Sequence, residues 1–357
     1  MSEERVNQGP VHVSVFGKTD LGRTREHNED TFLVADLSTG NASLQPEVRR
    51  HEVGARGSLF MVADGMGGAA AGELASAMAA DLIYRHMATA WAADEANTPD
   101  QFAYRMREAV ELANGHIYSY AREHPEVRGM GTTVTAAGVF GCDLYLTQIG
   151  DSRAYLVRGS EAVQLTKDQS LMQRLVDAGE LTQDEAEQSE RRNIILQALG
   201  PDPRVRVDLT HQPIRRGDTL ILCSDGLSGL VRREEFAQMA GEHADLSALC
   251  TALVDLANAR GGPDNITVVA ARFEGEGLPE ANGAEGIGHH RYQLAQTTTT
   301  PDLIPRPSSD ESNEPDTRAE SWMEAGFGST RALDLIRTVA LILITVGVLL
   351  LLLAVWR

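Results

Sequence analysis

The sequence predicts an α+β fold in which two packed antiparallel sheets are flanked by helices. Strand-like segments follow one another in groups joined by short turns, and helical segments come in consecutive pairs. Strands and helices do not alternate one by one, which excludes a doubly wound parallel sheet. With 357 residues, 42% of them hydrophobic, the chain can form one large domain with a real core or two ordinary ones.

Three strands are predicted near the N-terminus. Residues 11–16 alternate in strand fashion, and residues 31–35 and 58–63 are short apolar runs bounded by polar or glycine-rich stretches. Residues 36–56 between the last two are rich in Gly, Ser, Asn and charge, so we expect a loop or an exposed hairpin there.

Two long helices are expected next. The first covers residues 70–94, where apolar residues at helical spacing share one face. These residues are Leu74, Met78, Leu82 and Met87. Thr98 followed by Pro99 supplies an N-cap and a first-turn proline for the second helix, which runs to about residue 123.

The second half of the chain returns to strands and then to a helix pair. Residues 167–200, here called the flap, differ from their surroundings because they are charged, helical and cut by Gly179. Strands are predicted at residues 132–140, 144–149, 153–157, 162–165, 205–209, 219–223 and 265–273, and helices at 234–240 and 246–260. The first four strands are joined by short turns and form an antiparallel meander.

The charge and cysteine content exclude some classes of function. A formal net charge of −19 argues against a nucleic-acid surface, which requires clustered Lys and Arg. The three cysteines, Cys142, Cys223 and Cys250, are far apart and form no CxxC motif. We therefore expect neither a zinc knuckle nor a disulfide framework, and a reducing compartment is favoured.

The C-terminal part of the sequence predicts a linker and a membrane anchor. Residues 274–331 are acidic, rich in proline and without apolar periodicity, as is typical of a disordered linker. Residues 338–356 carry no charge and, as a helix at ~1.5 Å per residue, would match a bilayer core of roughly 30 Å. We expect a transmembrane helix within residues 332–357. Because no signal peptide is expected at the N-terminus, the domain at residues 1–273 is placed on the cytoplasmic side of the cell membrane.

Acidic side chains lie at the ends of several predicted strands, where a sheet edge meets water. They are Glu29, Asp30, Asp64, Asp151, Asp225 and Asp264. Carboxylates that converge in this way repel one another unless a cation lies between them. The sequence places no Lys or Arg next to Asp64, Asp225 or Asp264. All-oxygen ligands therefore favour magnesium or manganese over zinc.

Each acid also has a simpler interpretation. The Asp-Gly pairs at Asp64 and Asp225 are typical of turns, and Asp264 can cap the last strand. Asp151 can form a salt bridge with Arg153. These alternatives are independent of one another, so it is the occurrence of all the acids together that favours a metal centre.

Six motifs occur along the chain in a fixed order: RTREHNED, VADGMGGAAAGE, MGTT, IGDSRAY, CSDGL and GPDNIT. In this order they resemble the metal-dependent serine/threonine protein phosphatases of type 2C, in their bacterial form. The resemblance covers about residues 11–273. It implies a four-layer α-β-β-α sandwich, with two central antiparallel sheets flanked by helix pairs, and it implies two Mn²⁺ or Mg²⁺ ions with a third, weaker one.

The resemblance also assigns roles to the acids. It implies that Asp64 bridges two ions and that the Gly65 carbonyl binds one of them. It implies that Asp225 and Asp264 complete the shell of the other ion. Asp151 resembles the ligand of the third ion, shared with Asp225.

Three residues near the N-terminus complete the implied site. Glu29 and Asp30 are expected to hold metal-bound waters, with Glu29 as a possible direct ligand. Arg25 is the expected phosphate clamp, because its planar fork can bind two phosphate oxygens at once. The residues expected to take part in catalysis are Arg25, Asp30, Asp64 and Asp225.

The implied function is hydrolysis of phosphoserine and phosphothreonine in proteins by a metal-activated water. The expected partners are phosphorylated proteins, a Ser/Thr kinase at the same membrane, and the membrane itself, with no nucleic acid. The alternative is an inactive pseudo-phosphatase that binds phosphoproteins as a scaffold. Pseudoenzymes usually lose one or more of the acids, whereas all of them are present here.

The sequence departs from the family pattern at two places. Met66 stands where some members carry a histidine proposed as general acid, so the proton donor is left unassigned. In the flap, Gln169 and Ser189-Glu190 replace a common histidine and a His-Pro, which argues against a histidine role there. Arg191 and Arg192 can bind acidic residues near the phosphorylated residue of a substrate, or they can belong to a solvated helix face.

Overall fold

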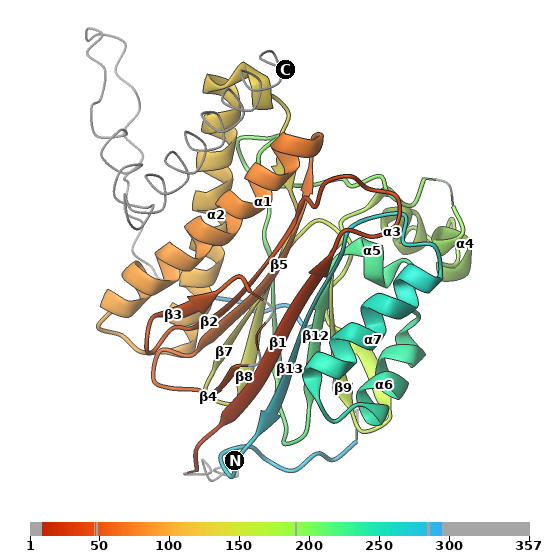
Figure 1. The fold of residues 1–357 in the computed structure, drawn as a ribbon. Helices are drawn as coiled ribbons and strands as arrows, with labels where there is room; N and C mark the ends of the chain where they lie inside the picture. The colour runs from red at the N-terminus through yellow and green to blue at the C-terminus, as the bar shows by residue number, and fades with distance from the viewer. Residues whose placement is uncertain (1–8, 46, 48, 190, 284–285, 295–357) are drawn as a thin grey trace, which may run out of the picture. The chain divides into compact units, whose positions relative to one another are not determined.

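The computed structural model describes residues 9–45, 47, 49–189, 191–283 and 286–294. Two antiparallel sheets pack face to face within them, and helices cover both outer faces (Figure 1). The helices α1 and α2 lie on one side of the sandwich, and α6 and α7 lie on the other. The predicted four-layer α-β-β-α sandwich is therefore confirmed.

The first sheet has six strands in the order β10-β9-β12-β13-β1-β4. The first and last strands of the domain are neighbours in this sheet, because β1 pairs with β13 from Asp20↔Ile266 to His12↔Glu274. The strands are β1 (His12–Asp20), β4 (Arg49–Glu52), β9 (Arg153–Arg158), β10 (Glu161–Gln164), β12 (Thr219–Cys223) and β13 (Ile266–Glu274).

The second sheet has the order β11-β8-β7-β5-β2-β3, with the short β6 paired to the end of β5. Its central strands carry apolar side chains on both faces, since one face meets the other sheet and the opposite face meets helices. The strands are β2 (Asp30–Asp36), β3 (Asn41–Ser43), β5 (Ser58–Met66), β6 (Gly131–Thr132), β7 (Val134–Phe140), β8 (Asp143–Ile149) and β11 (Asp208–Pro213).

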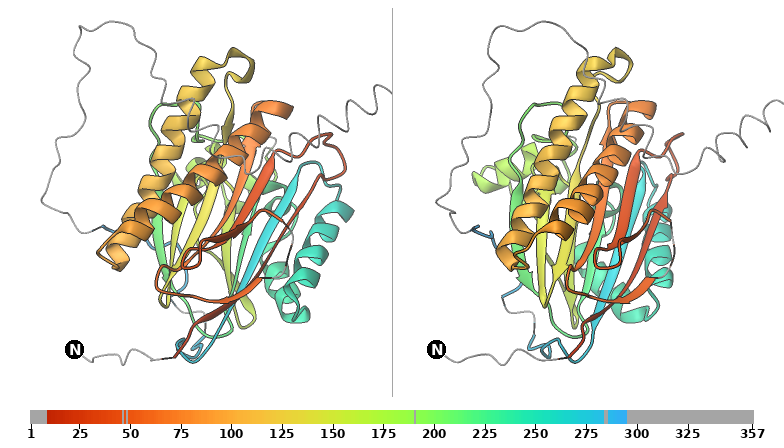
Figure 2. Two further views of the ribbon diagram at one scale, coloured as in Figure 1. Left: turned by 60° about the vertical axis from the view of Figure 1, so that its left-hand side comes forward. Right: turned by 90° about the vertical axis from the view of Figure 1, so that its left-hand side faces the viewer.

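The helices occur mainly where the sequence pattern predicts them. Figure 2 shows α1 and α2 running side by side over the second sheet. The α-helices are α1 (Ala69–His86), α2 (Pro99–Glu123), α3 (Leu171–Asp177), α4 (Gln183–Glu187), α5 (Asp225–Ser228), α6 (Arg233–Glu242) and α7 (Leu246–Ala259). A 3-10 turn, η2 (Pro125–Val127), follows α2. As expected, Thr98 caps α2 by accepting a hydrogen bond from the backbone N–H of Gln101.

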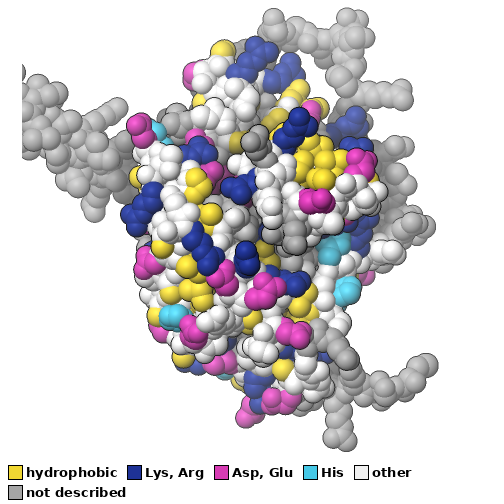
Figure 3. Space-filling model, turned by 90° about the vertical axis from the view of Figure 1, so that its right-hand side faces the viewer, with side chains coloured by type: hydrophobic (Ala, Val, Ile, Leu, Met, Phe, Trp, Pro, Cys, Tyr) yellow, Lys and Arg dark blue, Asp and Glu magenta, His cyan; other side chains and the backbone are white. Residues whose placement is uncertain are grey.

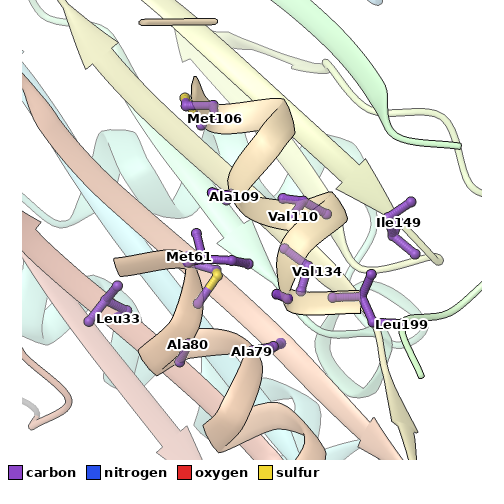
Figure 4. Close-up of a cluster of buried hydrophobic side chains, with 14 of the residues drawn as sticks. Leu33, Met61, Ala79, Ala80, Met106, Ala109, Val110, Val134, Ile149 and Leu199 are labelled. Carbon is purple, nitrogen blue, oxygen red and sulfur yellow. The ribbon is translucent and has the colours of Figure 1, made fainter. Parts of the chain in front are cut away.

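Three apolar clusters hold the layers together. One fills the space between the sheets, one lies under α6 and α7, and the largest lies between the second sheet and the pair α1–α2. Figure 4 shows part of the largest cluster, where Met106 and Val110 of α2 face strand residues such as Met61 and Val134. Burial of this amount of apolar surface makes the sandwich a rigid frame for residues at the strand ends.

Two element bounds differ from the sequence expectation. The first long helix changes at its C-terminal end into a π-turn, η1 (Met87–Trp91), which buries Met87 and Trp91. Apolar periodicity does not distinguish this wider turn from an α-helix. The strand expected at residues 205–209 lies later, at Asp208–Pro213, where it pairs with β8.

The C-terminal part of the sequence is described only in its first section. Residues 275–283 and 286–294, expected to belong to a linker, lie against the domain. Tyr292 donates its backbone N–H to the carbonyl of Leu209, and its ring meets that of Tyr145 edge-on at 5.2 Å. Among the described residues, no helix has the length and apolarity needed to cross a bilayer. The rest of the predicted linker and the transmembrane helix predicted within residues 332–357 lie outside those residues.

Candidate metal centre

The acidic residues predicted at strand ends gather at one end of the sandwich. Asp30 and Asp64 face each other as register partners on the neighbouring strands β2 and β5. Asp225 is the first residue of α5, which directly follows β12, and Asp264 lies just before β13. Since β12 and β13 belong to the other sheet, both sheets supply carboxylates to the same place.

A cavity of about 510 Å³ opens at this end of the sandwich. It is lined by Arg25, Glu29, Asp64, Gly65, Asp151, Asp225 and Asp264, together with Met66 and other residues of the loops. Asp30 does not line the cavity but is buried beside Asp64, its partner in the strand register. The structure thus brings together every site residue that the sequence singled out.

Asp30 is held by hydroxyl groups from the other sheet. The Ser224 hydroxyl donates to Oδ2 of Asp30 at 2.8 Å, and Ser224 is itself fixed by backbone hydrogen bonds to Thr267. Burial raises the pKa of Asp30 to about 7, although hydrogen bonds from Thr267 and Ser224 act in the opposite direction. These contacts include no positively charged group that would stabilise the ionised form of Asp30.

Asp64 sits at the centre of the acidic group. Its backbone is fixed by Thr132 and Thr133, whose hydroxyls donate to the carbonyl and accept from the N–H of Asp64. Burial raises the pKa of its carboxyl well above the ordinary value, and the charges of Asp30 and Asp225 add to this effect. Asp64 and Asp225 line the same cavity, and each carboxylate is destabilised by the negative charges around it. Carboxylates gathered in this way require a shared proton or a cation between them.

Asp151 is free to serve the centre because its nearest arginine is engaged elsewhere. Arg153 donates from Nη2 and Nε to Asp168, with Nη2 2.7 Å from Oδ2, and not to Asp151. Burial and the charge of Asp225 raise the pKa of Asp151 to about 8. The alternative in which Asp151 pairs with Arg153 is therefore wrong.

Arg25 contacts the centre directly. Its Nη2 lies 2.8 Å from Oδ2 of Asp264, and about half of its side chain is exposed to the cavity and solvent. No Lys or Arg is next to Asp264 in the sequence, but the loop near the N-terminus brings Arg25 beside it in the fold. Among the described residues, Asp264 is the only hydrogen-bond partner of the Arg25 side chain, so its other guanidinium donors are available to a phosphate in the cavity.

Gly65 is required by close backbone packing. A Cβ at this position would lie 2.2 Å from the carbonyl oxygen of Gly72 and 2.6 Å from that of Glu29. The Gly65 N–H also donates to the Glu29 carbonyl at 3.1 Å. A side chain at this position would therefore separate β5 from α1 and from the Glu29 loop, whether or not the Gly65 carbonyl binds an ion.

The donor set fits divalent ions that prefer oxygen. Among the described residues, no three acidic, His or Cys side chains gather closely enough to hold one ion by themselves. Magnesium usually keeps several waters and binds through one or two carboxylates, so each ion of a pair needs fewer side-chain ligands. Carboxylates with raised pKa values, such as the half-buried Asp64 and the buried Asp151, supply the negative charge that such ions would neutralise.

Sequence patterns missed the residues that hold the loops in place. Asn265 is buried, accepts from the Glu29 N–H, and donates to the carbonyls of Leu21 and His27. It thereby fixes the loop that carries Arg25, Glu29 and Asp30. The GPDNIT motif contains Asn265 next to Asp264, so the motif held a signal, but its role depends on contacts across the sheet.

The chain is similar to known proteins over this domain. The family model described as Protein phosphatase 2C matches residues 42–258. The serine/threonine phosphatase stp of Listeria monocytogenes is 37% identical over 253 residues, which is 71% of this chain and 92% of that protein. The serine/threonine protein phosphatase PstP of Mycobacterium tuberculosis is 37% identical over 254 residues, covering 71% of this chain and 44% of that protein.

Solved structures show the same fold. The M. tuberculosis PstP structure matches with a TM-score of 0.62 and 34% identity, covering 74% of this chain and 99% of that one. The catalytic domain of PstP in complex with two manganese ions matches with a TM-score of 0.60 and 32% identity, covering 74% and 99%. Staphylococcus aureus Stp1 matches with a TM-score of 0.63 and 31% identity, covering 72% and 94%.

The fold, the acidic centre and these relatives define the class of protein as serine/threonine protein phosphatases. Within that class, the chain belongs to the protein phosphatase 2C family. The family model leaves out residues 11–41 and Asp264, yet the structure places Arg25, Glu29 and Asp30 beside the matched part of the site.

Proposed function

We propose that this enzyme hydrolyses phosphoserine and phosphothreonine in proteins, using two Mn²⁺ or Mg²⁺ ions and, at Asp151, a third and weaker one. The observation that carries the proposal is the group of buried and half-buried carboxyl groups around Asp64, in which the pKa values of Asp64 and Asp151 are raised and an arginine lies at the rim. The M. tuberculosis relative in complex with two manganese ions supports the choice of metal.

The residues of the site have distinct tasks in this reaction. When bound, the two ions supply the positive charge that lowers the pKa of an attacking water and offsets charge on the phosphoryl oxygens. Asp64, Asp225, Asp264 and the Gly65 carbonyl would hold these ions, while Glu29 and Asp30 would orient waters around them. Arg25 binds phosphoryl oxygens through its other donors and positions the phosphorus for in-line attack.

No proton donor for the departing alkoxide is identified among the described residues that line the cavity. Met66 lines the cavity at the position where some members of the family carry histidine. Its thioether cannot donate a proton. The proposal therefore assigns no general acid to this stretch.

Metal-dependent turnover is the first test. The full chain should hydrolyse p-nitrophenyl phosphate and phosphothreonine peptides with Mn²⁺ or Mg²⁺ and stop in EDTA. Asp225→Asn should abolish turnover, whereas Asp255→Asn, an exposed site on α7, should leave it unchanged. Full activity in EDTA, or unchanged phosphate release by Asp225→Asn, would contradict the proposed centre. The scaffold alternative is not favoured, because the acids it would be expected to lack are present.

The location of the enzyme is a separate proposal. The uncharged run at residues 338–356 supports a single membrane-spanning helix with the catalytic domain on the cytoplasmic side, opposing a Ser/Thr kinase at the same membrane. The full chain should fractionate with membranes, and a chain lacking residues 333–357 should be released while keeping its turnover. If the full chain stayed in the soluble fraction, the tether would be excluded without any consequence for the catalytic proposal.

A further inference from the structure

A large groove leads away from the metal centre. Its volume is about 1350 Å³, and it shares Arg25, Asp225 and Asp264 with the smaller cavity. One wall is formed by the flap and the other by α5 and the start of α6. Small-molecule sites usually measure about 300–1,000 Å³, so this groove has room for a segment of polypeptide beside the phosphate.

The groove is rich in arginine although the chain as a whole is strongly acidic. Figure 3 shows the face that carries it, with Lys and Arg side chains spread over its upper and middle parts. The formal net charge of the whole chain is −19, so this concentration of cations is not the average of its surface. The lining also includes almost as many acidic residues, so the groove attracts anionic ligands only where a cation has no acidic partner.

Several of these cations are already neutralised by neighbours. Arg153 pairs with Asp168, Arg233 with Glu234, and Arg260 with Glu235. A charge engaged in this way has less to offer a ligand, because the ligand must displace the existing partner. The paired arginines therefore contribute to the structure of the groove walls more than to the attraction of an anionic substrate.

Arg192 and Arg232 differ from the paired residues. Both line the groove and are exposed, and neither side chain forms an ion pair in the part of the chain that the structure describes, although the charge of Arg232 does act on Glu235. Arg192 belongs to the flap wall and Arg232 to the opposite wall, at the residue before α6. Arg192 also lies near enough to the metal centre for its charge to lower the pKa of Asp225, against the larger raising effect of burial.

We propose that Arg192 and Arg232 bind a second anionic group of the substrate, on a peptide segment that lies in the groove beside the phosphorylated residue. The preferred substrates are then phosphoproteins with acidic side chains, or a further phosphate, close to the phosphate that is removed. This inference rests on the proposed phosphatase function. It goes beyond that function because it names the sequence context that the two walls select.

The test compares phosphothreonine peptides of one length. Their flanking residues are Gln in the first, Asp in the second, and Gln with one added phosphoserine in the third. The wild-type kcat/KM should be higher for the second and third peptides, and mass spectrometry identifies which phosphate is lost. Arg192→Gln and Arg232→Gln should each lower the ratio of acidic to neutral kcat/KM by about two- to fivefold, as expected for an exposed charge pair.

Arg191→Gln is the matched control. Arg191 is exposed and adjacent to Arg192, but it does not line the groove. Its substitution should leave the ratio unchanged, which separates a specific contact from general attraction. Equal kcat/KM for all three peptides in the wild type, or the same loss in Arg191→Gln, would overturn the proposal. Absence of metal-dependent p-nitrophenyl phosphate hydrolysis would instead contradict the phosphatase function on which it rests.

Discussion

Arg25 and Asp264 form an ion pair at the rim of the acidic centre, with Nη2 of Arg25 2.8 Å from Oδ2 of Asp264. The residue expected to bind phosphate thus touches a residue expected to bind a metal ion. Because about half of the Arg25 side chain is exposed, the pair contributes little to the stability of the fold. Its consequence is positional, since it aims the guanidinium at the place where phosphate would meet the ions.

Replacing Arg25 should therefore affect catalysis more than folding. Arg25→Ala should lower kcat/KM for a phosphothreonine peptide by about ten- to a hundredfold, because a hydrogen bond to a charged group contributes about 1.5–3 kcal/mol. The kcat/KM of Arg25→Lys should lie between those of the wild type and Arg25→Ala, since lysine keeps the charge but loses the planar fork. Thermal unfolding should change little. Arg23→Ala in the same loop serves as the control, and an equal loss there would argue against a specific clamp.

The stability of the metal-free protein should fall as pH rises. Burial raises the pKa of Asp30 from 3.8 to about 7 and that of Asp151 to about 8. Between the ordinary and the raised values, the folded state binds more protons than the unfolded state, so stability is lost as pH increases through this range. Calorimetry in EDTA between about pH 4 and pH 8 measures the effect. Excess Mn²⁺ should remove it, and identical profiles with and without metal would contradict the assignment.

The layers and the acids could be predicted because they depend on local patterns. Strand periodicity, the capping Thr98 and the placement of acids at strand ends are all properties of a few adjacent residues. The partners of those acids could not be predicted in this way. Arg153 has Asp151 two residues away, yet it bonds Asp168, because the pairing of β10 with β9 brings the residues after β10 back beside Arg153.

Contacts between distant segments explain the remaining differences. Arg25 and Asp264 are separated by 239 positions and lie together because the pairing of β1 with β13 brings their loops to the same end of the sheet. Asn265 likewise acts on a loop at the other end of the domain. Composition alone placed residues 274–331 in a linker, but the described residues up to 294 include Tyr292, whose packing depends on a surface created by the folded domain.

The Arg153–Asp168 pair should anchor the base of the flap. Its side chains are 18% and 9% exposed, so removing the carboxylate leaves a largely buried guanidinium without its partner. Asp168→Asn should lower the free energy of unfolding by up to about 3 kcal/mol in urea denaturation. Asp177→Asn is the matched control, because its pair with Lys167 is 44% exposed on each side and should be worth less than about 1 kcal/mol. Equal losses in the two variants would exclude a special role for Asp168.

The segment at residues 286–294 should stabilise the catalytic domain. His289 pairs with Asp208, and His211 donates its backbone N–H to the carbonyl of His290, so the segment adds to the edge strand β11. The Tyr292 ring packs against Tyr145, and its hydroxyl donates to Asp100 at the start of α2. Unpaired strand edges are prone to association, so this cover also protects the sheet.

Two truncations and one substitution test the role of this segment. A chain ending at residue 273 should unfold more easily and aggregate more than a chain ending at residue 294, although both contain the whole metal centre. Tyr292→Ala in the longer chain should cost about 1–2 kcal/mol, as expected for a half-buried aromatic contact and one hydrogen bond. Urea denaturation and light scattering measure the two effects, with Tyr118→Ala as control, because Tyr118 of α2 is also half-buried but has no ring contact with Tyr292 among the described residues. If both truncations were equally stable, the domain would end at Phe273, as the composition of the sequence indicates.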